Sequence, residues 1–260
     1  MKQRITSGVI IALVTIFACA LGYIALLPVC LFISAIACKE IVNLVRTKAF
    51  CKYLYFIMFV SICLICFGSI FYYVGFGLAI LLIEAIVLCC VVVFDERINF
   101  NDISLVYIMS AILGFGLYFF AYLQGISRLL FAYIIIISYL TDVFALVVGL
   151  LFGKHKLNQR ISPKKTIEGF IGGWIIGGII SFIWAYVFNF FGLPSYIFII
   201  SSITLPIVSQ LGDLIFSMIK RSYNIKDFSR LIPGHGGILD RLDSLLITSI
   251  FLGAIILILL

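Results

Sequence analysis

Long apolar stretches constrain this chain more than any other feature of its sequence. About 20 consecutive apolar residues, wound as a helix, cross the roughly 30 Å hydrocarbon core of a bilayer. Of the 260 residues, 64% are apolar and 11% are charged, a balance that excludes an ordinary soluble domain. We therefore expect an all-α polytopic membrane protein with about nine transmembrane helices. These are predicted at residues 6–26, 28–45, 53–73, 76–94, 103–123, 129–151, 168–191, 196–217 and 238–260.

The basic residues predict the orientation of these helices, because Lys and Arg of short connections accumulate on the cytoplasmic side. With a cytoplasmic N-terminus, 17 of the 18 Lys and Arg fall on that side, and only Arg128 lies in an outer connection. The first apolar run follows Lys2 and Arg4 as in a signal peptide, but a second run follows almost at once, so a retained helix is expected. The formal charge of +7 then reflects topology and attraction to anionic lipid headgroups, with no nucleic-acid partner expected.

The distribution of polar and charged residues changes near residue 125. Residues 1–125 are expected to be apolar helices with a mainly structural role, and Glu84 is their only obvious buried charge. Residues 126–260 are expected to form a catalytic transmembrane domain with polar cytoplasmic loops at 152–167 and 218–237. A charge inside a membrane helix costs about 3 kcal/mol on insertion scales, so intramembrane acids are functional candidates. The second part holds four of them, Asp142, Asp213, Asp240 and Asp243.

Two other sequence features favour packing over chemistry. Cys63 and Cys66 have CxxC spacing, but thiols in an apolar helix usually pack as small hydrophobic side chains. Glycines in the span 168–191 let helices approach closely because they present no side chain at the contact. These are Gly172, Gly173, Gly177 and Gly178.

The densest polar stretch, Ser217–Ser244, lies between two strongly apolar spans. Its glycines and proline form a turn at residues 233–237, and the last span begins at about residue 238. Free N–H groups and the positive end of a helix dipole would then point at one place. A helix start with free N–H groups is a favourable binding site for phosphate.

The acids and bases beside this turn form two helical stripes. Asp240 and Asp243 are three residues apart and share a helix face, and Asp213, Ser217 and Lys220 follow i, i+4, i+7 spacing. Mg²⁺ is usually held by one or two carboxylates with phosphates and water, so Asp213 and Asp240 suit a metal between the two helices. The alternative for Asp240 and Asp243 is pairing with the helix dipole and with neighbouring basic side chains. Spacing alone does not decide between the metal site and this structural pairing.

The other polar loop contains the run from Ser162 to Gly169. Ser162 followed by Pro163 is typical of a helix start, with the hydroxyl as the cap and proline in the first turn. Lys164 and Lys165 satisfy the rule that basic residues face the cytoplasm, and they would also neutralise a triphosphate. The spacing of these residues alone is weak evidence that the loop binds a triphosphate.

Ser217–Asp243 resembles the signature of the phosphatidate cytidylyltransferase (CDP-diacylglycerol synthase) family. The matching positions are Ser217, Lys220, Arg221, Lys226, Asp227, Pro233, His235, Gly236, Gly237, Asp240, Arg241 and Asp243. The resemblance extends to Ser162–Gly169, to Gln210–Asp213, and to Asp142 and Gly153. A long match without gaps is far more specific than a lone glycine pattern.

The resemblance implies a reaction in which CTP and phosphatidate give CDP-diacylglycerol and pyrophosphate, with Mg²⁺ as cofactor. It also implies a homodimer in the bacterial cytoplasmic (inner) membrane, in contact with membrane lipid, with an active site that faces the cytoplasm. The metal ligands carried over by position are Asp213 and Asp240. A second cation is compatible with the pattern, with Asp227 and Asp243 either orienting bases or completing its site.

The same resemblance implies roles for the remaining positions. The catalytic residues would be Asp213, Lys220, Arg221, Asp227, His235, Asp240, Arg241 and Asp243. The substrate-binding residues would be Ser162, Lys164, Lys165, Ser217, Lys226, Gly236 and Gly237. His235 either donates or accepts a proton or is structural, and Asp142 would reach the same site from the span 129–151.

Two rival functions remain at this point. A transporter would explain Asp142, Asp213 and Glu84 as ion or proton sites, but gives no reason for the glycine turn flanked by basic and acidic residues. The second rival is a related enzyme that acts on another lipid alcohol or phosphate, such as a polyprenol kinase. The full signature argues against it.

Overall fold

A computed structural model describes residues 22–45, 51–71, 73–188, 192–229, 231 and 236–260, and these are almost entirely helical. Within that part of the chain the helices are α2 (Tyr23–Val42), α3 (Cys51–Gly68), α4 (Val74–Phe94), α5 (Phe100–Ile126), α6 (Arg128–Phe152), α7 (Ile167–Val187), α8 (Ser195–Ser222) and α9 (Leu239–Leu259). Seven of them are long and apolar enough to cross a membrane, and α3 contains a shorter apolar stretch, Lys52–Gly68. The chain is therefore an all-α integral membrane protein, as its apolar spans predict.

The helices follow eight of the nine predicted spans closely. Most of the predicted span 6–26 lies outside the described residues, so the count of nine and the side of the N-terminus stay predictions. Some predicted boundaries are wrong by up to five residues. Helix α2 begins at Tyr23 instead of residue 28, and α8 continues to Ser222, into the predicted loop 218–237. Helix α3 ends at Gly68 and gives way to a 3-10 turn, η2 (Ser69–Phe71), although the apolar run continues to residue 73. Glycine is a poor helix former, and hydropathy alone does not register that break.

The chain forms two compact units. The first contains residues 1–125 and 227–240, and the second contains residues 126–226 and 241–260. Residues 227–240 thus cluster with the N-terminal helices, although a hundred residues of the other unit precede them in the chain. Helix α9 has its first two residues in the first unit and the remainder in the second.

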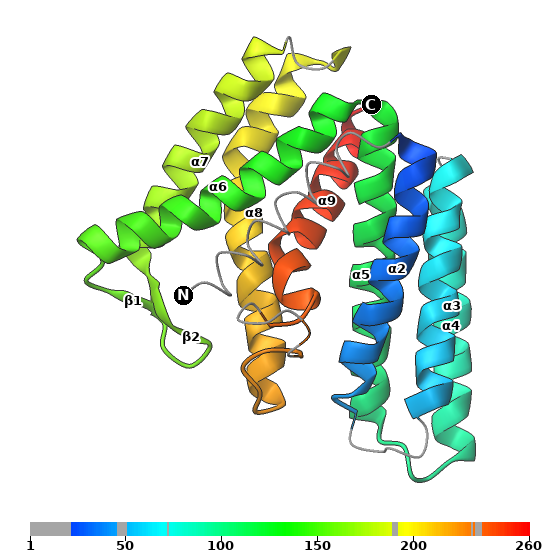
Figure 1. Cartoon of the computed structure of the whole chain (residues 1–260). Coiled ribbons are helices and arrows are strands. Elements are labelled where there is room, and N and C mark those ends of the chain that lie inside the picture. Colours follow the sequence, from blue (N-terminus) through cyan, green and yellow to red (C-terminus); the bar gives the residue numbers. More distant parts are fainter. Residues whose placement is uncertain (1–21, 46–50, 72, 189–191, 230, 232–235) are drawn as a thin grey trace. The chain divides into compact units, whose positions relative to one another are not determined.

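Helices α2 to α5 of the first unit lie alongside one another (Figure 1). Some of their close contacts are at glycines. A Cβ atom at Gly114 of α5 would lie 2.8 Å from Ile65 of α3. Three acids of this unit are buried, Glu40, Glu84 and Asp102, which expose 3%, 2% and 4% of their surface. The prediction that Glu84 is the buried charge of this part of the chain was therefore incomplete. Glu40 and Asp102 lie near helix ends, where sequence suggests exposure.

Helices α6 and α7 of the second unit pack through the glycines predicted for packing. A Cβ atom at Gly173 would lie 2.8 Å from the Thr141 carbonyl oxygen, and one at Gly177 would overlap the Thr141 hydroxyl. Gly172 faces α6 in the same way, whereas Gly178 faces the carbonyl oxygen of Ser202 on α8. The packing role of these glycines is confirmed.

Replacing Gly173 with alanine should lower the melting temperature in detergent, because the new methyl group meets α6 backbone that cannot move aside. Overpacking of this kind costs about 1–3 kcal/mol. Gly22→Ala is the control, because a Cβ atom there would meet nothing within 4 Å. Thermal unfolding followed by circular dichroism compares the two, and equal melting temperatures would refute the packing contact.

A short hairpin replaces the helix start that Ser162 and Pro163 predicted. Strands β1 (Lys156–Asn158) and β2 (Ser162–Thr166) pair antiparallel, with Lys156 opposite Thr166. Asn158 accepts hydrogen bonds from the N–H groups of Arg160 and Ile161 through Oδ1, at 3.1 and 3.2 Å, and so shapes the turn. The dihedral φ of proline also suits an extended strand, which is why the serine and proline pair misled the prediction.

Helix α7 takes its cap four residues later than predicted. Thr166 is the N-cap, and its hydroxyl accepts a hydrogen bond from the N–H of Gly169 at 3.1 Å. Glu168 in the first turn accepts hydrogen bonds from the backbone N–H of Lys154 at 3.1 Å and from Nδ1 of His155 at 2.6 Å. These contacts join both ends of the hairpin to the start of α7.

Candidate active site

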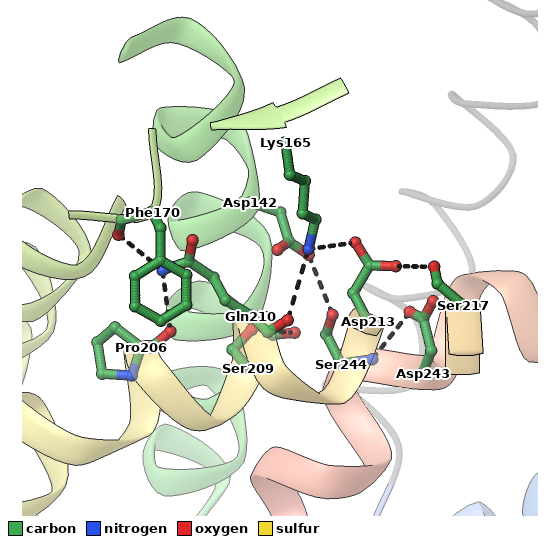
Figure 2. A network of polar contacts seen from close by, with 11 residues as sticks. Asp142, Lys165, Phe170, Pro206, Ser209, Gln210, Asp213, Ser217, Asp243 and Ser244 are labelled. Atoms are coloured by element: carbon green, nitrogen blue, oxygen red, sulfur yellow. Dashed lines mark hydrogen bonds and ion pairs between the residues drawn. The ribbon is translucent and has the colours of Figure 1, made fainter. Parts of the chain in front are cut away.

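An ion pair between Lys165 and Asp213 lies at the centre of a polar cluster in the second unit (Figure 2). Nζ of Lys165 lies 2.7 Å from Oδ2 of Asp213, and both side chains are largely shielded from solvent, with 24% and 30% exposed. The same ammonium group donates to the carbonyl oxygen of Gln210 at 3.4 Å. The pair connects strand β2 to helix α8, and its neighbours come from two further helices. We call the group Asp142, Lys165, Asp213, Ser217, Lys220, Asp243 and Ser244 the Lys165 cluster.

Helix α8 contributes a polar stripe to this cluster, as its spacing predicted. Asp213, Ser217 and Lys220 all lie within one continuous helix. The hydroxyl of Ser217 donates to Oδ1 of Asp213 at 3.4 Å, so both carboxylate oxygens have a partner. Lys220 is buried at 7% exposed. A charge so far out of water requires compensation by nearby acids.

Two more acids complete the cluster. Ser244 of α9 donates its hydroxyl to Oδ2 of Asp142 on α6 at 3.2 Å, and its N–H to Oδ1 of Asp243 at 2.8 Å. Asp142 interacts electrostatically with Lys165 and Asp213, and Asp243 interacts with Asp213 and Lys220. Three carboxyl groups of the described residues thus lie near two ammonium groups, and carboxyl oxygens are ligands that a hard divalent cation prefers.

The close approach of α8 and α9 depends on Gly212. A Cβ atom there would lie 3.2 Å from the carbonyl oxygen of Asp243 and 3.2 Å from Cα of Ser244. A larger side chain next to Asp213 would therefore separate the two helices that supply the acids. The glycine within the Gln210–Asp213 stretch of the signature is therefore required by this contact.

Lys164 and Lys165 lie on opposite faces of strand β2, although the sequence predicted the same role for both. Successive side chains of a strand point to opposite faces, so Lys165 turns toward α8 whereas Lys164 is exposed. The contacts of Glu168 hold the hairpin in this orientation. Only one of these two hairpin lysines therefore belongs to the cluster.

Arg221 joins the hairpin to the end of α8. Its Nε donates to the carbonyl oxygen of Ile161 at 3.3 Å, and its Nη1 donates to that of Ile225 at 2.7 Å. The guanidinium group is exposed, so it can also face an anion. Besides the charge role predicted from sequence, Arg221 holds the hairpin in place.

The glycine segment of the signature belongs to the first unit, where Asp240 organises it. Oδ2 of Asp240 accepts hydrogen bonds from the N–H groups of Phe228 and Gly237, both at 2.9 Å. Gly236 has φ of +85°, and a Cβ atom there would lie 2.8 Å from the same carboxylate oxygen. It would also lie 3.4 Å from Cβ of Asp227. The predicted residues Asp227, Gly236, Gly237 and Asp240 therefore lie together, whereas Pro233, Gly234 and His235 lie outside the described residues.

The start of α9 corrects the prediction of a phosphate site made of free N–H groups. The N–H groups of Ile238 and Leu239 donate to the two carboxylate oxygens of Glu40, each at 3.0 Å, and that of Gly237 donates to Asp240. Three consecutive amides at the helix start are thus already bound to carboxylates. The sequence analysis missed Glu40, because an acid near the end of an apolar span is expected to be exposed at the membrane surface.

The donor chemistry of the Lys165 cluster fits a hard divalent cation. Among the described residues no three His, Cys, Asp or Glu side chains come close enough to hold a metal ion by themselves. Mg²⁺ does not require such a cage, because phosphates and water complete its coordination. A carboxylate has about four acceptor positions, so Asp213 can bind a cation in addition to Lys165 and Ser217.

Comparison with known proteins assigns the chain to a family. Residues 2–259 match the model of the Cytidylyltransferase family. The chain belongs to the cytidylyltransferase family. Proteins named phosphatidate cytidylyltransferase from Staphylococcus haemolyticus (strain JCSC1435) and Staphylococcus aureus (strain COL) are 39% and 38% identical to it over 159 residues. Each alignment covers 61% of this chain and 61% of the relative, so the match spans less than two thirds of the relatives' length.

Within this cytidylyltransferase family member the predicted site residues fall into three groups. Lys165, Asp213, Ser217, Lys220 and Asp243 meet in the second unit, together with Asp142. Asp227, Gly236, Gly237 and Asp240 meet in the first unit. Lys164, Arg221, Lys226 and Arg241 are exposed, Ser162 is half-buried at the start of β2, and His235 lies outside the described residues. The residue that sequence did not identify, Glu40, contacts the second of these groups.

Proposed function

We propose that this chain transfers CMP from CTP to phosphatidate, giving CDP-diacylglycerol and pyrophosphate for phospholipid biosynthesis. The observation that carries the proposal is the Lys165 cluster, in which acids from three membrane helices gather near Lys165 of the polar hairpin and Lys220 of α8. Family membership and the names of the relatives support the nucleotidyl transfer. The signature from Ser217 to Asp243 supports the same substrates.

The reaction needs little covalent help from the protein. An oxygen of the phosphate monoester of phosphatidate attacks the α-phosphorus of CTP, a new P–O bond forms, and the bond to the α,β-bridging oxygen breaks. Pyrophosphate leaves with that oxygen. Catalysis then consists of positioning and charge neutralisation. Lys165 and Lys220 supply positive charge at a site shielded from water, where each charge acts more strongly than in solution.

Asp213 has two tasks in this proposal. Its ion pair holds the flexible Lys165 side chain in one orientation, so less conformational entropy is lost when a phosphate arrives. We further propose, from the signature, that Asp213 and Asp240 hold Mg²⁺, with Asp243 and Asp227 available for a second cation. Bound Mg²⁺ would neutralise phosphate charge and align the reacting groups.

The membrane location suits both substrates. Phosphatidate presents its headgroup at the interface while its acyl chains stay in the bilayer, and CTP is soluble. We propose a bacterial cytoplasmic membrane with the site facing the cytoplasm, because 17 of the 18 Lys and Arg fall on that side in the predicted topology. The proposed homodimer rests on the resemblance alone.

A labelling experiment tests the reaction against both rivals. The purified chain is incubated with phosphatidate, Mg²⁺ and CTP that carries ³²P at either the α- or the γ-position. The proposal predicts that α-label enters the lipid and γ-label appears in pyrophosphate, and that omitting phosphatidate abolishes both. Transfer of γ-label to lipid would indicate a kinase instead, and cation flux without turnover would indicate a transporter.

A further inference from the structure

Glu40 is a buried acid that the mechanism above does not use. Its carboxylate lies near the end of α2 and exposes 3% of the residue's surface. Among the described residues no basic side chain forms an ion pair with it. Its charge is compensated by hydrogen bonds, and a buried carboxylate that accepts several of them is firmly held.

The hydrogen bonds of Glu40 reach residues on both sides of positions 232–235. Oε1 accepts from the hydroxyl of Ser229 at 2.6 Å and from the N–H of Ile238 at 3.0 Å, and Oε2 accepts from the N–H of Leu239 at 3.0 Å. The Ser229 hydroxyl in turn accepts from the N–H of Leu231 at 3.2 Å. One side chain of α2 thus fixes backbone on each side of residues 232–235, about 190 to 200 positions further along the chain.

Gly237 fits Glu40 so closely that no side chain has room there. A Cβ atom at Gly237 would lie 2.5 Å from Oε1 and 2.7 Å from Oε2 of Glu40. The φ of Gly237 is not in the left-handed region, in contrast to that of Gly236. The glycine at position 237 is therefore required by the approach of the Glu40 carboxylate.

We propose that Glu40 is a positioning residue that holds the described flanks of the signature segment, residues 227–229 and 236–240, in their working conformation. It acts through the backbone at Ile238 and Leu239, and so sets the direction in which Asp240 leaves the first turn of α9. Asp240 reinforces the arrangement by binding Phe228 and Gly237. The catalytic part of this inference rests on the proposed function, whereas the structural part does not.

The test uses Glu40→Gln in the purified full chain. Glutamine keeps the shape and one acceptor oxygen, but its NH₂ group cannot accept a hydrogen bond from a backbone N–H. Amide hydrogen exchange at Ile238 and Leu239, followed by mass spectrometry, should become about tenfold faster or more, because hydrogen bonds to a charged group are lost. The same variant should lose about tenfold in kcat with little change in KM for CTP, because the substrate contacts themselves remain.

Glu84→Gln is the matched control, since Glu84 is an equally buried acid of the same unit with Ser61 and Ser110 as its polar neighbours. It should leave both exchange and kcat near wild-type values. Ser229→Ala removes a single hydrogen bond to Glu40 and should give a smaller change in the same direction, which keeps the test valid if Glu40→Gln does not fold.

The two readouts separate the inference from the proposed function. Unchanged exchange at residues 238 and 239 in both Glu40→Gln and Ser229→Ala would overturn the anchoring. Faster exchange with wild-type kcat would overturn the positioning role. Faster exchange in a chain whose wild type shows no CMP transfer would support the anchor while refuting the proposed reaction.

Discussion

Asp213→Asn is expected to lower the rate of CDP-diacylglycerol formation by at least about 100-fold, the scale seen when one preorganised electrostatic contact is removed from an active site. The substitution keeps the size of the side chain but removes the charge that lies 2.7 Å from Nζ of Lys165. Lys165 then loses its fixed orientation, and the proposed cation loses a ligand. Radiolabelled CTP with phosphatidate in mixed micelles measures kcat/KM.

The control for this prediction is Asp95→Asn, which changes the same chemical group in a short connection. Asp95 pairs with the exposed Arg97 at 3.3 Å and lies outside the Lys165 cluster. Because Asp95 has no part in the proposed reaction, activity should stay near that of the wild type. If kcat/KM of the Asp213→Asn enzyme stayed within about twofold of that of the Asp95→Asn enzyme, the proposed site would be contradicted, because removing a catalytic electrostatic contact costs about 100-fold.

Lys165→Ala and Lys164→Ala are expected to have very different effects, although the two lysines are adjacent in sequence. Lys165 contacts Asp213 and the carbonyl oxygen of Gln210, whereas Lys164 is exposed on the other face of β2. Loss of Lys165 leaves three carboxylates with one ammonium group, and activity should fall by about 100-fold. Replacing Lys164 should lower the activity by no more than a few-fold, because only the long-range attraction of CTP becomes weaker.

Both lysine variants are compared in the same assay, with CTP varied at saturating phosphatidate. Melting temperature in detergent shows whether either variant is unfolded. Equal losses for the two variants would indicate that the hairpin only contributes general positive charge. That outcome would refute the role given to the Lys165–Asp213 pair.

Much of the architecture follows from local features of the sequence. Apolar runs long enough for a bilayer predicted α4, α6 and α8 to within a few residues at most ends, because hydropathy and helix length are properties of single segments. The stripe of Asp213, Ser217 and Lys220 was predictable for the same reason, since i, i+4, i+7 spacing places side chains on one helix face.

The features that sequence did not predict depend on contacts between distant segments. Glu40 meets Leu239 across 199 positions, and no local pattern near residue 40 indicates that contact. The run from Ser162 to Thr166 is short and polar, so its pairing with β1 competes with a helix start that fits the same residues. The distinction between Lys164 and Lys165 appears only once that strand is recognised.

The most direct test of the central claim follows the oxygen atoms of phosphatidate. Phosphatidate is prepared with ¹⁸O in the terminal oxygens of its phosphate monoester, converted by the purified chain, and the lipid product and pyrophosphate are analysed by mass spectrometry. Attack by that phosphate on the α-phosphorus of CTP predicts CDP-diacylglycerol that retains every ¹⁸O atom, together with unlabelled pyrophosphate. Loss of ¹⁸O from the lipid, or the absence of CDP-diacylglycerol, would contradict the proposed reaction.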